Sequence, residues 1–473
     1  MSGKSNSREE SLSSEVERLA TAFMSVSFSS AADLWRFQLD LLAVQRDIQG
    51  EIGNIKRMPL PRGEKKESLD RFRNLRWQAK RLGDAFGWAL LGGSQKTIQS
   101  LSENEKTPIS PRESDQDLAL IVVAQQLANT RNVFPLLHDV TDVLRIGDIT
   151  FIDVHDSRRR HSTVEVKSRV IEERIDQGKR SLECRVSLIS PTSLDHLIAG
   201  DWTPDIDDSP VDQSLGPAEE NSGPTKNNPR TARQIKRMSR AFRLQNAIDG
   251  ELVEIEGELP SLSIPVKSGI DPDWQLVDRL LQRARLVGYA FEQLDDAVGV
   301  AAFYSRDEVN VQTVIDTHIL KDIEGMALQA GLPGSLAIFS IPDVERERPA
   351  LHLPFHLYPI PLNNRIDLAA GRLAIFIFLM TGPVYNALEA AGFTVVQPTE
   401  NPASTPPYLL VSKYVDYPNE GRIRVEFNPF SLIADVVYEF RNTEHLVNAS
   451  IVQAQSMAAT FYARISGSND RDD

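Results

Sequence analysis

The segment "GDITFIDVHDSRRRHSTVEVKS" (Gly147–Ser168) has two runs rich in β-branched residues, one on each side of a basic cluster. Runs of this composition are typical of β-strands. We therefore predict one strand at Asp148–His155 and a second at Ser162–Ser168, with the arginines in the turn between them. Two strands joined in this way form an antiparallel hairpin, which brings the start of the first strand close to the end of the second.

The second strand carries a charged pair. Side chains alternate between the two faces of a strand, so Glu165 and Lys167 share one face while Val164 and Val166 share the other. Asp148 begins the first strand, where the hairpin lets it approach both charged residues. One interpretation is an exposed hairpin with a cross-strand acid–lysine pair. The other is a site that holds a metal ion against a phosphate.

Two converging carboxylates without a histidine or cysteine partner are suited to a hard cation such as Mg²⁺ or Mn²⁺. Such a cation lowers the pKa of a bound water and neutralises charge that develops on a phosphate. Lys167 would orient that water or stabilise the transition state. Under this interpretation the pattern predicts hydrolysis of a phosphodiester, with Asp148, Glu165 and Lys167 as the catalytic residues.

These residues resemble the motif of the PD-(D/E)XK nuclease superfamily, the fold of restriction endonucleases. Asp148 matches the first acid, Glu165-Val166-Lys167 matches the second half, and Gly147 stands where the motif has its nominal proline. The resemblance implies that Asp148, Glu165 and the backbone carbonyl of Val166 are the metal ligands. It also implies an αβββαβ core over about residues 113–250, and a role in bacterial defence or DNA processing.

Basic residues surround this pattern. Arg158, Arg159 and Arg160 form the predicted hairpin tip, and a predicted helix over residues 231–248 is basic throughout. Contacts from such residues to phosphates position a duplex without reading its bases. The basic candidates for nucleic-acid binding in this helix are Arg233, Lys236, Arg237, Arg240 and Arg243, and the resemblance adds Gln234. The competing interpretation is a solvated basic face, paired with the acidic stretch at residues 195–228.

The whole chain is predicted to be an α+β protein with several domains. Residues 1–112 form a helical domain with amphipathic helices at Arg36–Ile55 and Glu67–Leu91. Residues 113–255 form the nuclease-like domain, with an acidic loop insertion at 195–228, and residues 256–473 form an α+β domain of unknown role. In this last domain we expect a helix at Trp274–Leu294 and strand character at Leu432–Phe440.

Composition limits the function classes. The 473 residues carry a net charge of −14, which argues against a protein that coats nucleic acid indiscriminately. The single cysteine, Cys184, rules out an intramolecular disulfide and favours a cytoplasmic location. The longest apolar run, Arg372–Met380, is too short to span a bilayer, so no membrane partner is expected.

Together these features predict a Mg²⁺-dependent deoxyribonuclease, with RNA as the second candidate substrate. Cutting both strands of a duplex usually requires two active sites, so a homodimer is expected, and the C-terminal domain is a candidate for binding a trigger or protein partner. Two alternatives stay open. One is a non-catalytic nuclease-like module that binds DNA or protein in a larger assembly, and the other is a structural protein with an ordinary hairpin.

Overall fold

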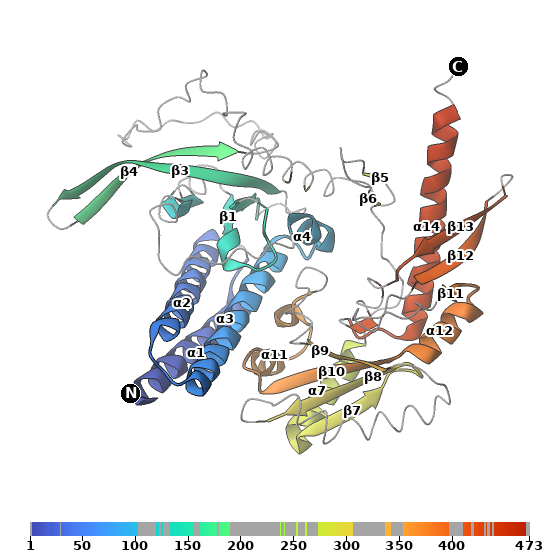
Figure 1. The fold of residues 1–473 in the computed structure, drawn as a ribbon, viewed down its shortest axis with the longest axis horizontal. Coiled ribbons are helices and arrows are strands. Elements are labelled where there is room, and N and C mark those ends of the chain that lie inside the picture. Colours follow the sequence, from blue (N-terminus) through green and yellow to red (C-terminus); the bar gives the residue numbers. More distant parts are fainter. Residues whose placement is uncertain are drawn as a thin grey trace. The chain divides into compact units, whose positions relative to one another are not determined.

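The chain folds into two compact units, Met1–Gln245 and Asn246–Asp473, each of which is described by itself (Figure 1). The structure is a computed structural model. It describes residues 2–28, 30–102, 120–122, 124–125, 133–146, 148–154, 161–176, 179–189, 237, 241, 252–253, 261–262, 273–305, 336–341, 353–396, 410–417, 421–429, 432, 436–437 and 439–469. Mixed helix and antiparallel sheet occur along the described chain, in agreement with the predicted α+β class.

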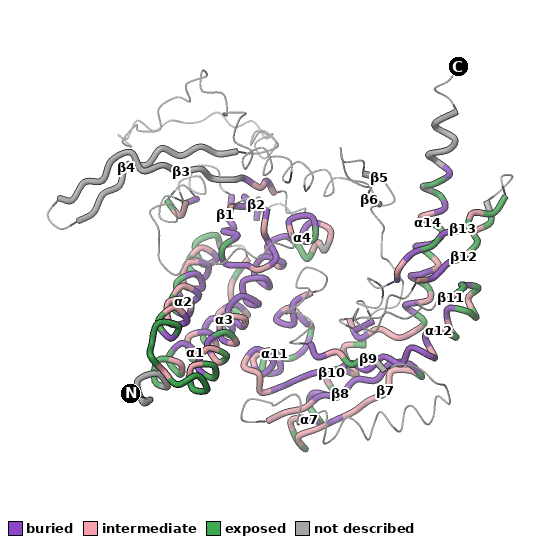
Figure 2. Tube along the Cα trace, viewed as in Figure 1, coloured by how far each residue is buried: buried purple, intermediate pink, exposed green. Residues whose placement is uncertain are grey.

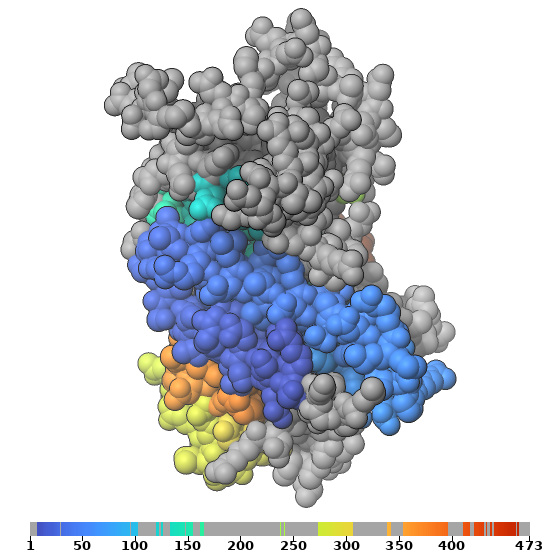
Figure 3. Space-filling model, turned by 90° about the vertical axis from the view of Figure 1, so that its left-hand side faces the viewer, coloured from blue at the N-terminus to red at the C-terminus, as the bar shows by residue number. Residues whose placement is uncertain are grey.

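Helices dominate the start of the first unit. They are α1 (Ser2–Ser25), α2 (Ala31–Arg57), α3 (Arg62–Leu90) and α4 (Gln95–Leu101). The predicted helices at 36–55 and 67–91 correspond to α2 and α3, because the apolar stripes that identified them are the buried faces of these helices. The hydroxyl of Ser30 caps the N-terminus of α2 by accepting a hydrogen bond from the Asp33 backbone N–H at 3.3 Å. Figure 3, which views the left-hand side of Figure 1, shows helices α1 to α3 in blue as one continuous surface.

One sheet follows the helices in the same unit. Its strands are β1 (Phe134–Leu137), β2 (Ile149–Ile152), β3 (His161–Asp176) and β4 (Lys179–Ile189), in the order β1-β2-β3-β4 with antiparallel pairing throughout. A short 3₁₀ helix, η1 (His138–Val140), follows β1. The predicted hairpin at 148–168 is therefore present as β2 and β3. The resemblance implies an αβββαβ order, in which three strands precede the second helix. In the structure a fourth strand, β4, directly follows β3.

The core of this unit lies between the helices and the sheet. Phe134 of β1 packs edge-on against Phe86 of α3 and Trp35 of α2, with ring centroids 5.9 and 6.5 Å apart. Every residue of β1 and β2 is buried, which Figure 2 shows in purple. Burial on both faces explains why β2 reads "ITFI" rather than as an alternation of polar and apolar residues.

The second unit is built around a sheet in the order β7-β8-β10-β9, again antiparallel. Its strands are β7 (Tyr289–Gln293), β8 (Val298–Tyr304), β9 (Leu336–Ser340) and β10 (Leu373–Met380). All of β10 is buried, so the longest apolar run of the sequence is a central strand of a sheet. Two short strands, β5 (Leu252–Val253) and β6 (Ser261–Leu262), pair with each other.

Helices and a second sheet complete this unit. The helical elements are α7 (Trp274–Val287), η4 (Phe355–Leu357), α11 (Leu362–Ala369), α12 (Thr381–Ala390) and α14 (Thr443–Asn469). The sheet contains β11 (Thr394–Val396), β12 (Leu410–Tyr417) and β13 (Gly421–Phe427). Asp367 is nearly buried and forms ion pairs with Arg285 and Arg372, which tie α7 and the start of β10 to α11.

Two sequence expectations in this unit are wrong. The helix predicted at 274–294 ends at Val287, because Gly288 adopts a left-handed conformation (φ 88°) that terminates a helix, and the chain continues as β7. The segment predicted as a strand at 432–440 instead has helical residues at Leu432, Val436 and Val437. Val436 and Val437 are buried, and tertiary packing here outweighs the preference of valine for strands.

Candidate active site on the β2–β3 hairpin

The register of the sheet brings the two predicted acids to neighbouring positions. The β2–β3 ladder ends at the pair Ile149 and Val164, so Asp148 and Glu165 are the next residues on the two strands. The Asp148 backbone N–H donates to the Val164 carbonyl at 2.8 Å, and its carbonyl accepts from the His138 N–H at 3.0 Å. The start of β2 is thus held by hydrogen bonds on both sides. Asp148 is partly buried.

A chain of side-chain hydrogen bonds lies on one face of the hairpin. Nε2 of His138 is 2.7 Å from the Thr150 hydroxyl, which is 2.8 Å from the Thr163 hydroxyl on β3. His138 and Thr150 are both buried. Glu165 and Lys167 follow Thr163 at alternate positions of β3, so strand geometry places them on the face of this chain. We did not predict His138 from the sequence, where it stands in a segment without clear periodicity.

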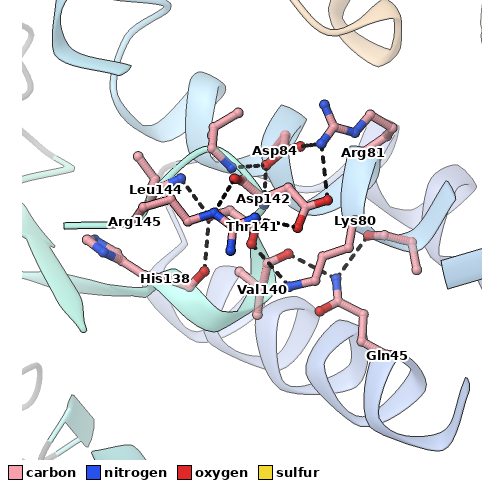
Figure 4. Close-up of polar contacts among 12 residues, drawn as sticks. Gln45, Lys80, Arg81, Asp84, His138, Val140, Thr141, Asp142, Leu144 and Arg145 are labelled. Atoms are coloured by element: carbon pink, nitrogen blue, oxygen red, sulfur yellow. Dashed lines mark hydrogen bonds and ion pairs between the residues drawn. The ribbon is translucent and has the colours of Figure 1, made fainter. Parts of the chain in front are cut away.

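The turn that carries His138 is fixed by a buried carboxylate from α3. Asp84 accepts hydrogen bonds from the backbone N–H groups of Asp142 and Val143, at 2.6 and 2.9 Å (Figure 4). Arg81, one turn earlier on α3, forms an ion pair with Asp84 and lies 3.4 Å from the Asp142 carboxylate. The Asp84 and Arg81 side chains are at most 2% exposed, so this network is shielded from water.

The carbonyl groups of the same turn are bonded from two helices. Lys80 donates to the carbonyl of Asp139 and, at 3.1 Å, to that of Thr141. Gln45 of α2 donates to the Val140 carbonyl at 2.9 Å (Figure 4). A buried backbone carbonyl without a partner would cost free energy, so these polar side chains are required wherever the turn enters the core.

The segment that leads into β2 is held at one further point. The carbonyl of Leu101, the last residue of α4, accepts hydrogen bonds from the N–H groups of Arg145 and Ile146 at 2.8 and 3.2 Å. Three helices therefore position the backbone immediately before Asp148.

Burial changes the ionisation of this network. It raises the pKa of the Asp84 carboxyl to about 6, although Arg81 acts in the opposite direction. Burial also lowers the pKa of the Lys80 ammonium to about 8. For Asp142 burial acts to raise the pKa, but the attraction of Lys80 and Arg81 outweighs it, and the net shift is downward. All four groups bond to backbone or to one another, so we assign the shifts to a structural network.

The other predicted site residues are placed only in part. Arg237 is helical and partly buried, and Ala241 is the only other residue of the helix predicted at 231–248 that the structure describes. For Glu165, Val166 and Lys167 the structure gives the backbone of β3. The remaining predicted binding residues lie outside the described residues: Arg158, Arg159, Arg160, Arg233, Gln234, Lys236, Arg240 and Arg243. The acidic stretch at 195–228 also lies outside them.

The donor set at the hairpin fits a hard divalent cation in its chemistry. Asp148 and Glu165 supply carboxylates from adjacent strands, and a backbone carbonyl of β3 could add a third oxygen. Among the side chains that the structure describes, no three His, Cys, Asp or Glu residues are grouped as metal ligands would be. The side chains of Glu165, Val166 and Lys167 are not part of that set.

Comparison of the chain with models of protein families, with curated proteins and with solved structures finds no match. In the described part of the chain, no helix has the length and apolar character that crossing a bilayer requires.

Proposed function

We propose that this protein is a metal-dependent nuclease that hydrolyses phosphodiester bonds in DNA, with Asp148, Glu165 and Lys167 as its catalytic residues. The observation that carries the proposal is the register of β2 and β3, in which Asp148 and Glu165 directly follow the last pair of the ladder. Glu165 and Lys167 are two residues apart on β3, so strand alternation puts the positively charged lysine on the same face as the acid. The resemblance to the PD-(D/E)XK motif rests on these same residues.

Each residue has a distinct proposed role. The carboxylates of Asp148 and Glu165 and the carbonyl of Val166 would hold Mg²⁺ or Mn²⁺. When bound, the cation supplies an activated water and stabilises charge on the phosphate. Lys167 orients the water or stabilises the negative charge of the transition state through its ammonium group. His138 is a positioning residue, because its backbone N–H and its ring hold Asp148 and Thr150 in place.

The first prediction is that the full chain cleaves supercoiled plasmid DNA in Mg²⁺ or Mn²⁺ and that EDTA stops cleavage. Asp148→Asn, Glu165→Gln and Lys167→Met should each lower the cleavage rate by roughly 100-fold or more, since each removes a group that acts on the reacting phosphate or its water. Rates are measured on plasmid and on labelled single- and double-stranded DNA and RNA, which also identifies the substrate.

Matched controls lie on β3 and β4. Glu173→Gln and Lys179→Met make the same chemical changes near the far end of the β3–β4 hairpin, and they should leave the rate within about twofold of the unaltered chain. Thermal unfolding shows whether each variant is folded. If the unaltered chain binds DNA but cleaves no polynucleotide in either metal, the protein is a non-catalytic binding module. If the site variants cleave as fast as the unaltered chain, the proposed residues are wrong.

A further inference from the structure

The hairpin of β3 and β4 extends well beyond the rest of its sheet. β2 pairs only with residues 161–164 of β3, whereas β4 pairs with β3 from Glu165 to Asp176 (Figure 1). We call the part formed by residues 165–176 and 179–189 the ribbon. It begins at the proposed site, because Glu165 is its first paired residue.

The ribbon has two chemically different faces. Strand alternation and the register assign each residue to one of them, and a β-bulge between Val170 and Glu172 shifts the alternation by one residue. The first face contains Glu165, Lys167, Arg169, Glu172, Arg174, Asp176, Lys179, Ser181, Glu183, Arg185, Ser187 and Ile189. The second face contains Val166, Ser168, Val170, Glu173, Ile175, Arg180, Leu182, Cys184, Val186 and Leu188. The bulge thus keeps most of the charges on the face of the proposed catalytic residues.

Cations on this polar face are concentrated next to the proposed site. Arg169 is directly opposite Arg185 in the register, and Lys167 is one position nearer to Glu165 on the same face. Like charges directly opposite each other destabilise a pair of strands, so two arginines at paired positions are unfavourable unless an anion lies between them. An anion that contacts both guanidinium groups would remove this repulsion, and arginine binds phosphate strongly through paired hydrogen bonds.

An acidic row marks the outer limit of this basic region. Glu172 is opposite Glu183 immediately beyond the arginine pair. These carboxylates would repel a polynucleotide, so contact with phosphates is favoured only between Glu165 and Arg169 along β3. At a strand rise of about 3.3 Å per residue, the arginine row is about 13 Å from Glu165.

We propose that Arg169 and Arg185 form a phosphate-binding pair, which holds the backbone of the nucleic-acid substrate about 13 Å from Glu165. The inference rests on the proposed function for the class of substrate, but it does not require cleavage. The competing explanation is an internal lattice of ion pairs between the two arginines and the two glutamates of the next row.

The test measures the affinity of the full chain for a 20-base-pair fluorescent DNA duplex by anisotropy, in EDTA, over a series of salt concentrations. The double variant Arg169→Gln/Arg185→Gln should bind about tenfold or more weakly, and the slope of log affinity against log salt should fall by about 1 to 2. Arg174→Gln is the matched control, because Arg174 lies on the same face beyond the acidic row, opposite Ser181. It should change affinity by less than about twofold.

A second readout separates the two explanations. Without nucleic acid, Arg169→Glu should raise the melting temperature, because the new carboxylate faces Arg185 and replaces a repulsive pair with an attractive one. A lower melting temperature combined with unchanged DNA affinity in the double variant would establish the internal lattice and overturn the proposal. Equal losses of affinity in the double variant and in Arg174→Gln would also overturn it, since the effect would then be general electrostatics.

The outcomes also separate this inference from the proposed function. Binding that depends on the arginine pair without any cleavage contradicts the nuclease and supports the phosphate-binding pair. If the unaltered chain cleaves DNA and the double variant binds DNA with unchanged affinity, only the phosphate-binding pair is contradicted. If the unaltered chain binds neither DNA nor RNA, both proposals fail.

Discussion

Asp84 is a residue whose chemistry is set by the folded structure. Its carboxylate receives the N–H groups of Asp142 and Val143 and pairs with Arg81, with no exposure to water. Through these bonds α3 holds the turn that presents His138 to the start of β2. Asp84 is therefore a structural support for the proposed site, placed behind it and not in it.

The raised pKa of Asp84 predicts a pH dependence of stability. The carboxyl is protonated more readily in the folded chain, where its pKa is about 6, than in the unfolded chain, so its contribution is present at low pH and is lost as pH rises through 6. Between pH 5 and pH 7 the unaltered chain should lose about 1 kcal/mol of unfolding free energy relative to Asp84→Asn. Urea unfolding at both pH values measures this difference.

The range from pH 5 to pH 7 separates the contribution of Asp84 from that of Lys80. Lys80 has a lowered pKa of about 8, so its contribution has the opposite sign and develops at higher pH. Asp70→Asn is the matched control, because Asp70 forms an exposed ion pair with Arg73 on the same helix. If the unfolding free energy of the unaltered chain rises with pH relative to that of Asp84→Asn, the result would contradict a raised pKa for Asp84.

At the scale of elements, the distance between α3 and η1 is set by one glycine. A Cβ at Gly83 would lie only 1.8 Å from the Val140 carbonyl oxygen, whereas a Cβ at Gly87, one turn later, would meet the nearest side chain at 3.4 Å. The helix can therefore approach the turn only where it has no side chain.

We predict opposite effects of the same substitution at these two glycines. Gly83→Ala should lower the unfolding free energy by about 2 kcal/mol or more, because α3 must move away from the turn and weaken its hydrogen bonds. Gly87→Ala should be neutral or stabilise by up to about 1 kcal/mol, since alanine favours helix and finds ordinary packing contact. Chemical denaturation of both variants measures this, and similar effects at the two positions would contradict the close approach.

β4 shows what the sequence analysis missed at this scale. Apolar residues alternate with polar ones from Leu182 to Leu188, a period typical of a strand with one buried face. The resemblance places a helix at residues 231–248 after the sheet and assigns no element to residues 179–189. The structure instead extends β3 and pairs it with β4 across a bulge.

At the scale of the whole molecule, every described element of the proposed site belongs to the unit Met1–Gln245. The helices predicted as a separate domain, residues 1–112, pack in this unit against β1 and η1. They support the hairpin through β1 and the turn that includes η1.

A chain that ends at Gln245 should therefore retain the proposed activity. We expect it to unfold cooperatively in urea, as followed by circular dichroism, and to cleave plasmid within about tenfold of the full-length rate. The full-length chain, measured alongside, is the reference. A fragment that is folded but inactive would show that the unit Asn246–Asp473 contributes to catalysis.

Strong local signals in the sequence predict several of the elements. The apolar stripes of α2 and α3 and the hairpin of β2 and β3 follow from periodicity and turn composition, which depend only on near neighbours in the chain. For the same reason, the sequence predicts that Asp148 and Glu165 lie close together, since one short turn joins their strands.

Which of the polar residues are buried depends on tertiary packing. In the sequence, Lys80, Arg81 and Asp84 are indistinguishable from the charged residues of an exposed helix face, and His138 has no periodic context. The burial of Lys80, Arg81 and Asp84 depends on a turn more than fifty residues away in the chain, whose backbone groups need partners inside the core. Contacts at that separation leave no local pattern, so packing alone assigns these residues to the support of the proposed site.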